Sequence, residues 1–280
     1  AGAAPLFKKL SLELGGKNAT IVCADADLEK TIPGAARAAF MNQGQVCLCG
    51  SRLLIERSIW DEFVPRFVSH VEGMTVGVPR DYFFPDDGAI NADTKALAEA
   101  ALDTLEGLGA TLVDVSIPSL EYAGGAQQTI MLSEAYAYHR TNLVNRPEDF
   151  GEMVRGRFRL GGLVSGGDYV QAQRVRNVIK REFAEVLKTV DVIATPTMST
   201  PPPPFSTASS RNTSSLRSLT GPYNLTGMPA ISVPCGLTPD GLPVGFQIGG
   251  KPFDESTVFQ VAYAYQQQVR LYERRPPELD

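Results

Sequence analysis

The stretch Val71-Glu-Gly-Met-Thr-Val-Gly-Val-Pro-Arg80 separates two parts of the chain that differ in their sequence motifs. Within it, Met74-Thr-Val-Gly-Val78 predicts a strand, and Pro79 ends the run. The residues before this stretch and the residues after it carry different sets of motifs. We therefore place a join near Glu72 and predict two segments, residues 1–72 and residues 73–280.

The composition is that of a globular protein, with 280 residues of which 43% are hydrophobic and 20% are charged. The net charge of −5 gives no electrostatic reason to expect nucleic acid or an anionic membrane as a partner. No apolar run approaches the roughly 20 residues that span a bilayer, and no secretory signal opens the chain. The expected location is the cytoplasm.

Cysteine and histidine are too few and too widely spaced for a disulfide framework or a zinc site. The four cysteines are Cys23, Cys47, Cys49 and Cys235, and only two histidines accompany them. We expect free thiols in a reducing compartment and no metal site.

The pattern of apolar residues predicts strands that alternate with helices in both segments. In the first segment, expected strands at residues 21–23 and 52–55 are each followed by a helix, which makes a β–α–β–α piece. In the second, expected strands at 74–78, 109–115 and 190–197 are separated by expected helices at 91–107, 127–143 and 169–189. The predicted fold class is α/β, a layered mixed or parallel sheet with flanking helices, assembled from two partial folds. Sheet edges left unpaired in such an assembly favour homo-oligomer formation.

Two motifs in the first segment carry a resemblance. Leu12-Glu-Leu-Gly-Gly-Lys17 and Asn42-Gln-Gly-Gln-Val-Cys47, at the separation they have here, resemble the catalytic segment of the aldehyde dehydrogenase family. The resemblance implies that Cys47 is a thiol nucleophile and Glu13 its general base. Without the resemblance, Cys47 is interpreted as a buried small side chain and Glu13 as a solvated charge. The NAD-binding domain of that family has no counterpart in the chain, so NAD is expected only if that domain were supplied.

The second segment carries a different resemblance. Its motifs are Asp168-Tyr-Val-Gln-Ala172, Val190-Asp-Val-Ile-Ala-Thr-Pro-Thr197, Tyr223-Asn-Leu-Thr-Gly-Met-Pro-Ala-Ile-Ser-Val-Pro-Cys-Gly236 and Gly241-Leu-Pro-Val-Gly-Phe-Gln247. Combined and in this order they resemble the amidase signature family. The resemblance implies hydrolysis or transfer at amide C–N bonds by a Ser–Ser–Lys triad, with backbone N–H groups stabilising the oxyanion.

The triad of that family lies in a part that has no counterpart here, so weak or absent activity is expected. Arg157 aligns with a substrate-contacting arginine of the family's amidotransferase members, and a solvated arginine is the alternative. Ser165, within Gly161-Gly-Leu-Val-Ser-Gly-Gly167, is interpreted as part of a turn at a helix boundary rather than as a nucleophile.

Three hypotheses follow. The first is an amidase-signature hydrolase fragment that acts on a small-molecule amide, needs no cofactor and has little activity of its own. The second is a thiol site at Cys47 and Glu13 that acts on aldehydes or activated esters. The third is a folded module without catalysis.

Overall fold

The computed structural model describes residues 19–40, 52–68, 73–204 and 218–274. Its strands are β1 (Ala19–Val22), β2 (Arg52–Ile55), β3 (Thr75–Val78), β4 (Thr111–Asp114), β5 (Val192–Pro196), β6 (Ala230–Leu237) and β7 (Pro243–Gly250). Its α-helices are α1 (Leu28–Phe40), α2 (Trp60–Val68), α3 (Arg80–Phe83), α4 (Ala92–Gly107), α5 (Ala123–Asn145), α6 (Glu152–Leu160), α7 (Gly166–Val186), α9 (Gly221–Thr226) and α10 (Glu255–Val269).

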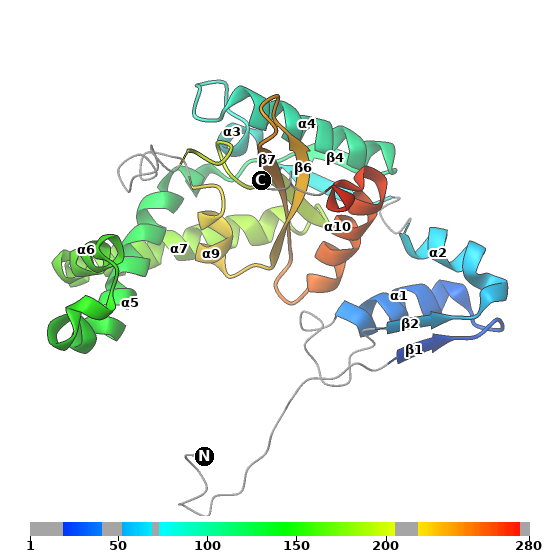
Figure 1. Cartoon of the computed structure of the whole chain (residues 1–280), viewed down its shortest axis with the longest axis horizontal. Coiled ribbons are helices and arrows are strands. Elements are labelled where there is room, and N and C mark those ends of the chain that lie inside the picture. The colour runs from blue at the N-terminus through cyan, green and yellow to red at the C-terminus, as the bar shows by residue number, and fades with distance from the viewer. Residues whose placement is uncertain (1–18, 41–51, 69–72, 205–217, 275–280) are drawn as a thin grey trace, which may run out of the picture.

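The larger sheet has five strands in the order β4-β3-β5-β7-β6 (Figure 1). Strands β4, β3 and β5 run parallel to one another, whereas β7 is antiparallel to both β5 and β6. Helices cover this sheet, so the predicted class is confirmed: an α/β fold with a mixed sheet and flanking helices. The expected strands and helices of residues 74–197 all form, with ends that shift by a few residues.

Strand β5 lies at the centre of the sheet, and every one of its residues is buried. Its apolar run, Val192-Ile-Ala, suits a strand that is covered on both faces. Asp191, the residue before the strand, fixes the pairing with β3. Its carboxylate accepts a hydrogen bond from the Thr75 N–H at 2.8 Å, and its own N–H donates to the Thr75 carbonyl at 2.8 Å.

Two adjacent glycines of β7 show that the helices form a layer on each face of the sheet. A Cβ on Gly249 would lie 2.1 Å from Cε1 of Tyr223 in α9, and a Cβ on Gly250 would lie 2.5 Å from Cγ2 of Val258 in α10. Because successive strand residues point to opposite faces, α9 and α10 cover opposite sides. The missing side chains allow both helices to approach the strand closely.

The N-terminal residues form a smaller unit with a core of its own. Strands β1 and β2 pair in parallel, and α1 connects them, as the β–α–β–α pattern predicted. The buried side chains of this core come from β1, α1 and α2: Val22, Ile32, Ala35 and Phe63. Helices α1 and α2 pack against α10, which places the unit beside the larger sheet (Figure 1).

The outer face of the small sheet is uncovered in the described residues. Ile21 and Leu54 are register partners on this face, and both side chains are exposed. Parallel sheets are ordinarily covered on both faces, so this face is unusual. Homo-oligomer formation through exposed sheet edges, and the boundary near residue 72, both stay predictions.

Replacing Gly249 by Ala tests the close approach of α9 to the sheet. The added methyl group would overlap the buried ring of Tyr223, so we expect a loss of about 1–3 kcal/mol in the free energy of unfolding. Urea unfolding measures this loss. The control is Gly124→Ala in α5, where no atom lies within 4 Å of the new Cβ and a gain of up to about 1 kcal/mol is expected. Equal stabilities of the two variants would contradict the packing described here.

Candidate functional site

The parallel strands β3, β4 and β5 bring their carboxyl ends to one edge of the larger sheet. Val78, the last residue of β3, is the register partner of Asp114 at the end of β4. Arg80, two residues after the end of β3, begins α3, and Thr197 follows β5. In open α/β sheets, ligands bind outside the carboxyl ends of the strands. This edge is therefore the first place to look for functional side chains.

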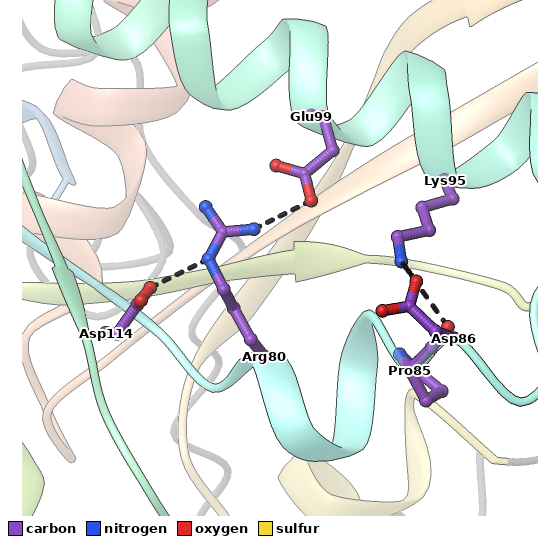
Figure 2. A network of polar contacts seen from close by, with 6 residues as sticks. All are labelled: Arg80, Pro85, Asp86, Lys95, Glu99 and Asp114. Carbon is purple, nitrogen blue, oxygen red and sulfur yellow. Dashed lines mark hydrogen bonds and ion pairs between the residues drawn. The ribbon is translucent and has the colours of Figure 1, made fainter.

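Arg80 is the centre of a network of ion pairs at this edge (Figure 2). Its Nη1 donates to Glu99 of α4 at 2.7 Å, and its Nε donates to Asp114 at 2.8 Å. The guanidinium also lies over the ring of Phe84, 5.6 Å from its centroid. The hydrogen bond to Glu99 raises the pKa of Arg80. With two carboxylates already bound, Arg80 ties α3, α4 and β4 together rather than offering a free cation to a ligand.

A second pair in Figure 2 secures the chain before α4. The Lys95 amine donates to the Asp86 carboxylate at 2.5 Å and to the Pro85 carbonyl at 3.5 Å. The hydrogen bond from Lys95 lowers the pKa of Asp86. Asn91 is the N-cap of α4, and its side-chain oxygen accepts hydrogen bonds from the Asp93 and Thr94 N–H groups. These contacts fix the entry into α4.

Polar side chains inside the sheet are engaged with one another. Gln247 of β7 donates to the Thr195 hydroxyl of β5 at 3.3 Å and to the Leu219 carbonyl at 3.3 Å. Nearby, the hydroxyls of Thr197 and Ser232 are 2.7 Å apart. Burial of Gln247 and Thr195 requires such partners, whereas the Thr197–Ser232 pair is exposed. They join the segment before α9 to the sheet and supply no unpaired nucleophile.

Of the predicted site residues, Glu13 and Cys47 lie outside the described residues. Arg157 lies on the exposed face of α6. Helix α6 is far from α3 in Figure 1, so the structure does not bring Arg157 to the strand edge beside Arg80. Among the described residues, no carboxylate forms an ion pair with Arg157, which leaves its guanidinium open to solvent.

Ser165 caps α7, as the sequence predicted. Its hydroxyl accepts a hydrogen bond from the Asp168 N–H at 3.1 Å and donates to the Asp168 carboxylate at 2.7 Å. This reciprocal arrangement is typical of a helix N-cap. The hydroxyl is thereby held in a capping role, and no hydrogen bond of the described residues joins it to a lysine amine.

The described cysteines are unpaired, as expected. Cys23 is exposed and Cys235 is buried, and neither forms a disulfide. Burial raises the pKa of the Cys235 thiol to about 12, so this thiol stays protonated at neutral pH. In the described ranges, no group of three or more His, Cys, Asp or Glu side chains is arranged to hold a metal ion. Among the helices in the same ranges, none has both the length and the apolar composition of a membrane span.

Two features of the structure had no signal in the sequence. Arg80 meets partners that lie far from it in the chain, so no local motif announces the network. The second feature is an aromatic cluster in which His139 of α5 stacks on Phe158 of α6, with ring centroids 5.1 Å apart, and meets Phe150 edge-on at 5.4 Å. The spacing of these rings in the sequence resembles no motif, and the cluster attaches α6 to α5.

Comparison with known proteins agrees with this architecture. The model of the amidase family matches residues 53–259. The chain is 36% identical over 230 residues to an amidase from Pseudomonas putida, in an alignment that covers 77% of this chain and 48% of that protein. It is 35% identical over 245 residues to the A-type subunit of glutamyl-tRNA(Gln) amidotransferase from Methanosarcina mazei, covering 78% of this chain and 50% of that protein. The chain thus spans about half the length of these curated relatives.

Solved structures give the same result. The A-type subunit of glutamyl-tRNA(Gln) amidotransferase from Thermotoga maritima superposes with a TM-score of 0.58 and 33% identity, over 70% of this chain and 43% of that chain. The crystal structure of an amidase superposes with a TM-score of 0.61 and 26% identity, over 71% and 46%. Neither the family match nor the relatives indicates a cofactor.

The comparisons do not support the resemblance of residues 1–72 to aldehyde dehydrogenases. The family match begins at residue 53, within β2. It therefore overlaps the segment to which that resemblance was assigned.

A double-mutant cycle tests the Arg80 network. We expect Arg80 to couple to Glu99 by about 0.5–1 kcal/mol and to Asp114 by less, because the Asp114 carboxylate is 73% exposed and that of Glu99 only 33%. The variants are Arg80→Gln with Glu99→Gln, and Arg80→Gln with Asp114→Asn, compared by urea unfolding. The exposed pair Lys188–Glu185 is the control, with little coupling expected. Stronger coupling to Asp114 than to Glu99 would contradict this account.

Proposed function

The chain belongs to the amidase family, and from this premise we propose that it is part of a hydrolase of amide C–N bonds in small molecules. We further propose that its 280 residues do not include the Ser–Ser–Lys triad, so that this polypeptide alone turns over amides weakly or not at all. The observation that carries the proposal is the extent of the match: the family model covers residues 53–259, whereas the chain spans only about half of each curated relative.

The hydrogen bonds of the described residues support the second part. Triad chemistry needs a lysine amine beside a serine hydroxyl, so that the proton of the nucleophile can be accepted. In the described ranges, the hydrogen-bonded lysine amines contact carboxylates or a carbonyl instead: Lys95 contacts Asp86 and Pro85, and Lys188 contacts Glu185. Ser165 is held by Asp168.

Arg157 is the residue we assign to substrate. A guanidinium binds a carboxylate through two parallel hydrogen bonds, and Arg157 is exposed and unpaired within the described residues. Arg80, by contrast, is already bound by two carboxylates. The substrate class that fits Arg157 is an amide that carries a carboxylate. Two relatives are components of amidotransferases, which agrees with an amide substrate.

Ammonia release from a panel of small amides, with and without a carboxylate, tests this proposal. We expect the purified chain to release ammonia no faster than the uncatalysed reaction, because none of the hydrogen bonds of the described residues joins a serine hydroxyl to a lysine amine. Ser165→Ala serves as the matched control and should behave as the unaltered chain does. Turnover that Ser165→Ala abolishes would show that the chain contains a working nucleophile and would refute the proposal.

A thiol site at Cys47 and Glu13 is the second candidate, and the topology of the small unit favours it. Strands β1 and β2 are parallel and begin as register partners, Ala19 beside Arg52. Glu13 precedes β1 and Cys47 precedes β2, each by a few positions in the sequence. A carboxylate beside a thiol has the chemistry of an activated nucleophile.

Hydrolysis of p-nitrophenyl acetate tests the thiol site. If Cys47 is the nucleophile, Cys47→Ala removes the protein-dependent rate, whereas Cys23→Ala leaves it unchanged because Cys23 is an exposed thiol outside the motif. An unchanged rate in Cys47→Ala excludes this site. If ammonia release and ester hydrolysis are both absent, the non-catalytic module is the hypothesis that is left.

A further inference from the structure

The outward face of α7 carries a cluster of positive charge, although the net charge of the chain is −5. Four cations lie close together in the middle of this helix, at Arg174, Arg176, Lys180 and Arg181. Arg174, Lys180 and Arg181 are exposed. The helix packs against α5 and α9 with its other sides (Figure 1). The positive charge is therefore a local feature of the surface that the acidic composition of the chain conceals.

No carboxylate of the described residues neutralises this cluster. Among those residues, none of the four cations forms an ion pair. The acidic residues that follow in the helix have other partners. Both carboxylate oxygens of Glu182 accept hydrogen bonds from Ser119, at 2.7 and 3.0 Å, and Glu185 accepts one from Lys188 at 2.7 Å. Because the nearby negative charges are engaged, the positive potential of the cluster remains open to an anion from solution.

A shallow pocket of about 420 Å³ lies within the cluster, and its lining residues are Asn177, Lys180, Arg181 and Ala184. They occupy positions i, i+3, i+4 and i+7 of α7, which share one face of a helix. All four are exposed, so the pocket opens to solvent. Pockets of about 300–1,000 Å³ hold small molecules. We call these four residues the α7 pocket.

The α7 pocket is rich in hydrogen-bond donors. The Lys180 ammonium carries three N–H donors, and the Asn177 side-chain amide carries two. The Nε of Arg181 donates to the main-chain carbonyl of Asn177 at 3.2 Å, and within the described residues both Nη groups of Arg181 have no partner. Ala184 contributes only a methyl group, so the space in front of these donors stays open. Two cations and a neutral amide suit an acceptor that has several oxygens and more than one negative charge.

A phosphate group has this chemistry, because it presents three acceptor oxygens and a charge of about −1.5 to −2 at pH 7. Lysine binds phosphate as a point charge and arginine as a planar fork, and the α7 pocket places one of each side by side. A carboxylate has a single charge and two oxygens, so it would match only one of the two cations. We propose that the α7 pocket binds the phosphate group of a small phosphorylated molecule.

The size of the pocket and the charge of the whole chain favour a small ligand. A nucleic acid presents many phosphates over a long surface, and a chain with a net charge of −5 repels such a polyanion outside the cluster. A single phosphate group meets only the local potential of α7. The inference does not depend on amide hydrolysis, since none of the lining residues is assigned to that reaction.

Titration calorimetry on the full 280-residue chain tests the proposal, with glycerol 3-phosphate as the probe and glycerol as the ligand that lacks the phosphate. We expect one molecule of glycerol 3-phosphate to bind per chain and glycerol not to bind. Lys180→Gln with Arg181→Gln should raise the dissociation constant about tenfold or more, because charge-assisted hydrogen bonds are lost. Arg140→Gln with Arg274→Gln is the control, since it removes the same charge at exposed positions outside the pocket and should bind as the unaltered chain does.

A second pair of variants separates charge from shape. Ala184→Glu and Ala184→Gln insert side chains of the same length at an exposed position of α7, and both residues favour a helix. Only Ala184→Glu adds a negative charge inside the pocket. We expect Ala184→Glu to weaken the binding of glycerol 3-phosphate at least tenfold more than Ala184→Gln does. Circular dichroism verifies that both variants keep the helical content of the unaltered chain.

Three results would overturn the proposal. The first is no heat of binding for glycerol 3-phosphate at millimolar concentration. The second is equal affinity of Ala184→Glu and Ala184→Gln for this probe. The third is a duplex DNA that binds through Lys180 and Arg181 while glycerol 3-phosphate does not, which would make a nucleic acid the ligand. Because the readout is phosphate binding, a negative result leaves the proposed amide hydrolysis unaffected, and a failure of amide hydrolysis leaves this proposal unaffected.

Discussion

The pairing of β5 with strands on both sides is the constraint on which the larger domain depends. On one side β5 pairs in parallel with β3, and on the other it pairs antiparallel with β7. The parallel and antiparallel parts of the sheet are therefore joined through this one strand. Because all residues of β5 are buried, its backbone N–H and C=O groups need hydrogen-bond partners on the neighbouring strands. Asp191 sets the register on the β3 side. The glycines of β7 then let α9 and α10 close over the two faces.

Much of this fold is visible in the sequence because its signals are local. The apolar run of residues 190–197 predicts the buried strand, and the helix at α4 is announced by Asn91 and an apolar face that includes Leu102 and Leu105. The sequence does not show the contacts between residues that lie far apart in the chain. Tyr223 packs on Gly249, and Arg80 joins Glu99 and Asp114, through contacts that exist only after the sheet has formed. The exposed positions of α6 were equally hidden, since an apolar residue in a helix gives no sign of whether a neighbour covers it.

The family assignment explains the scaffold more fully than it explains the chemistry. The matched residues supply a sheet core and the helices that cover it, so the shared half folds around its own buried side chains. The small N-terminal unit has a separate core and meets the rest through α10. Fold and function are distinct in such a case, because catalysis depends on particular side chains placed on the scaffold. Ser165, Lys95 and Lys188, which could have served, are held by carboxylates or carbonyls.

Arg80 and Arg157 differ in their ion pairs: Arg80 has two carboxylate partners, whereas Arg157 has none among the described residues. Arg80 stands at the strand edge where α/β proteins usually bind ligands, yet two carboxylates already satisfy its guanidinium and an aromatic ring lies beneath it. Its contribution is to hold three elements in place. Arg157 stands on a peripheral helix, with apolar side chains before and after it and no ion-pair partner in the described residues. The described residues therefore account for the position of the Arg80 guanidinium through its two ion pairs, whereas no ion pair of the described residues fixes that of Arg157.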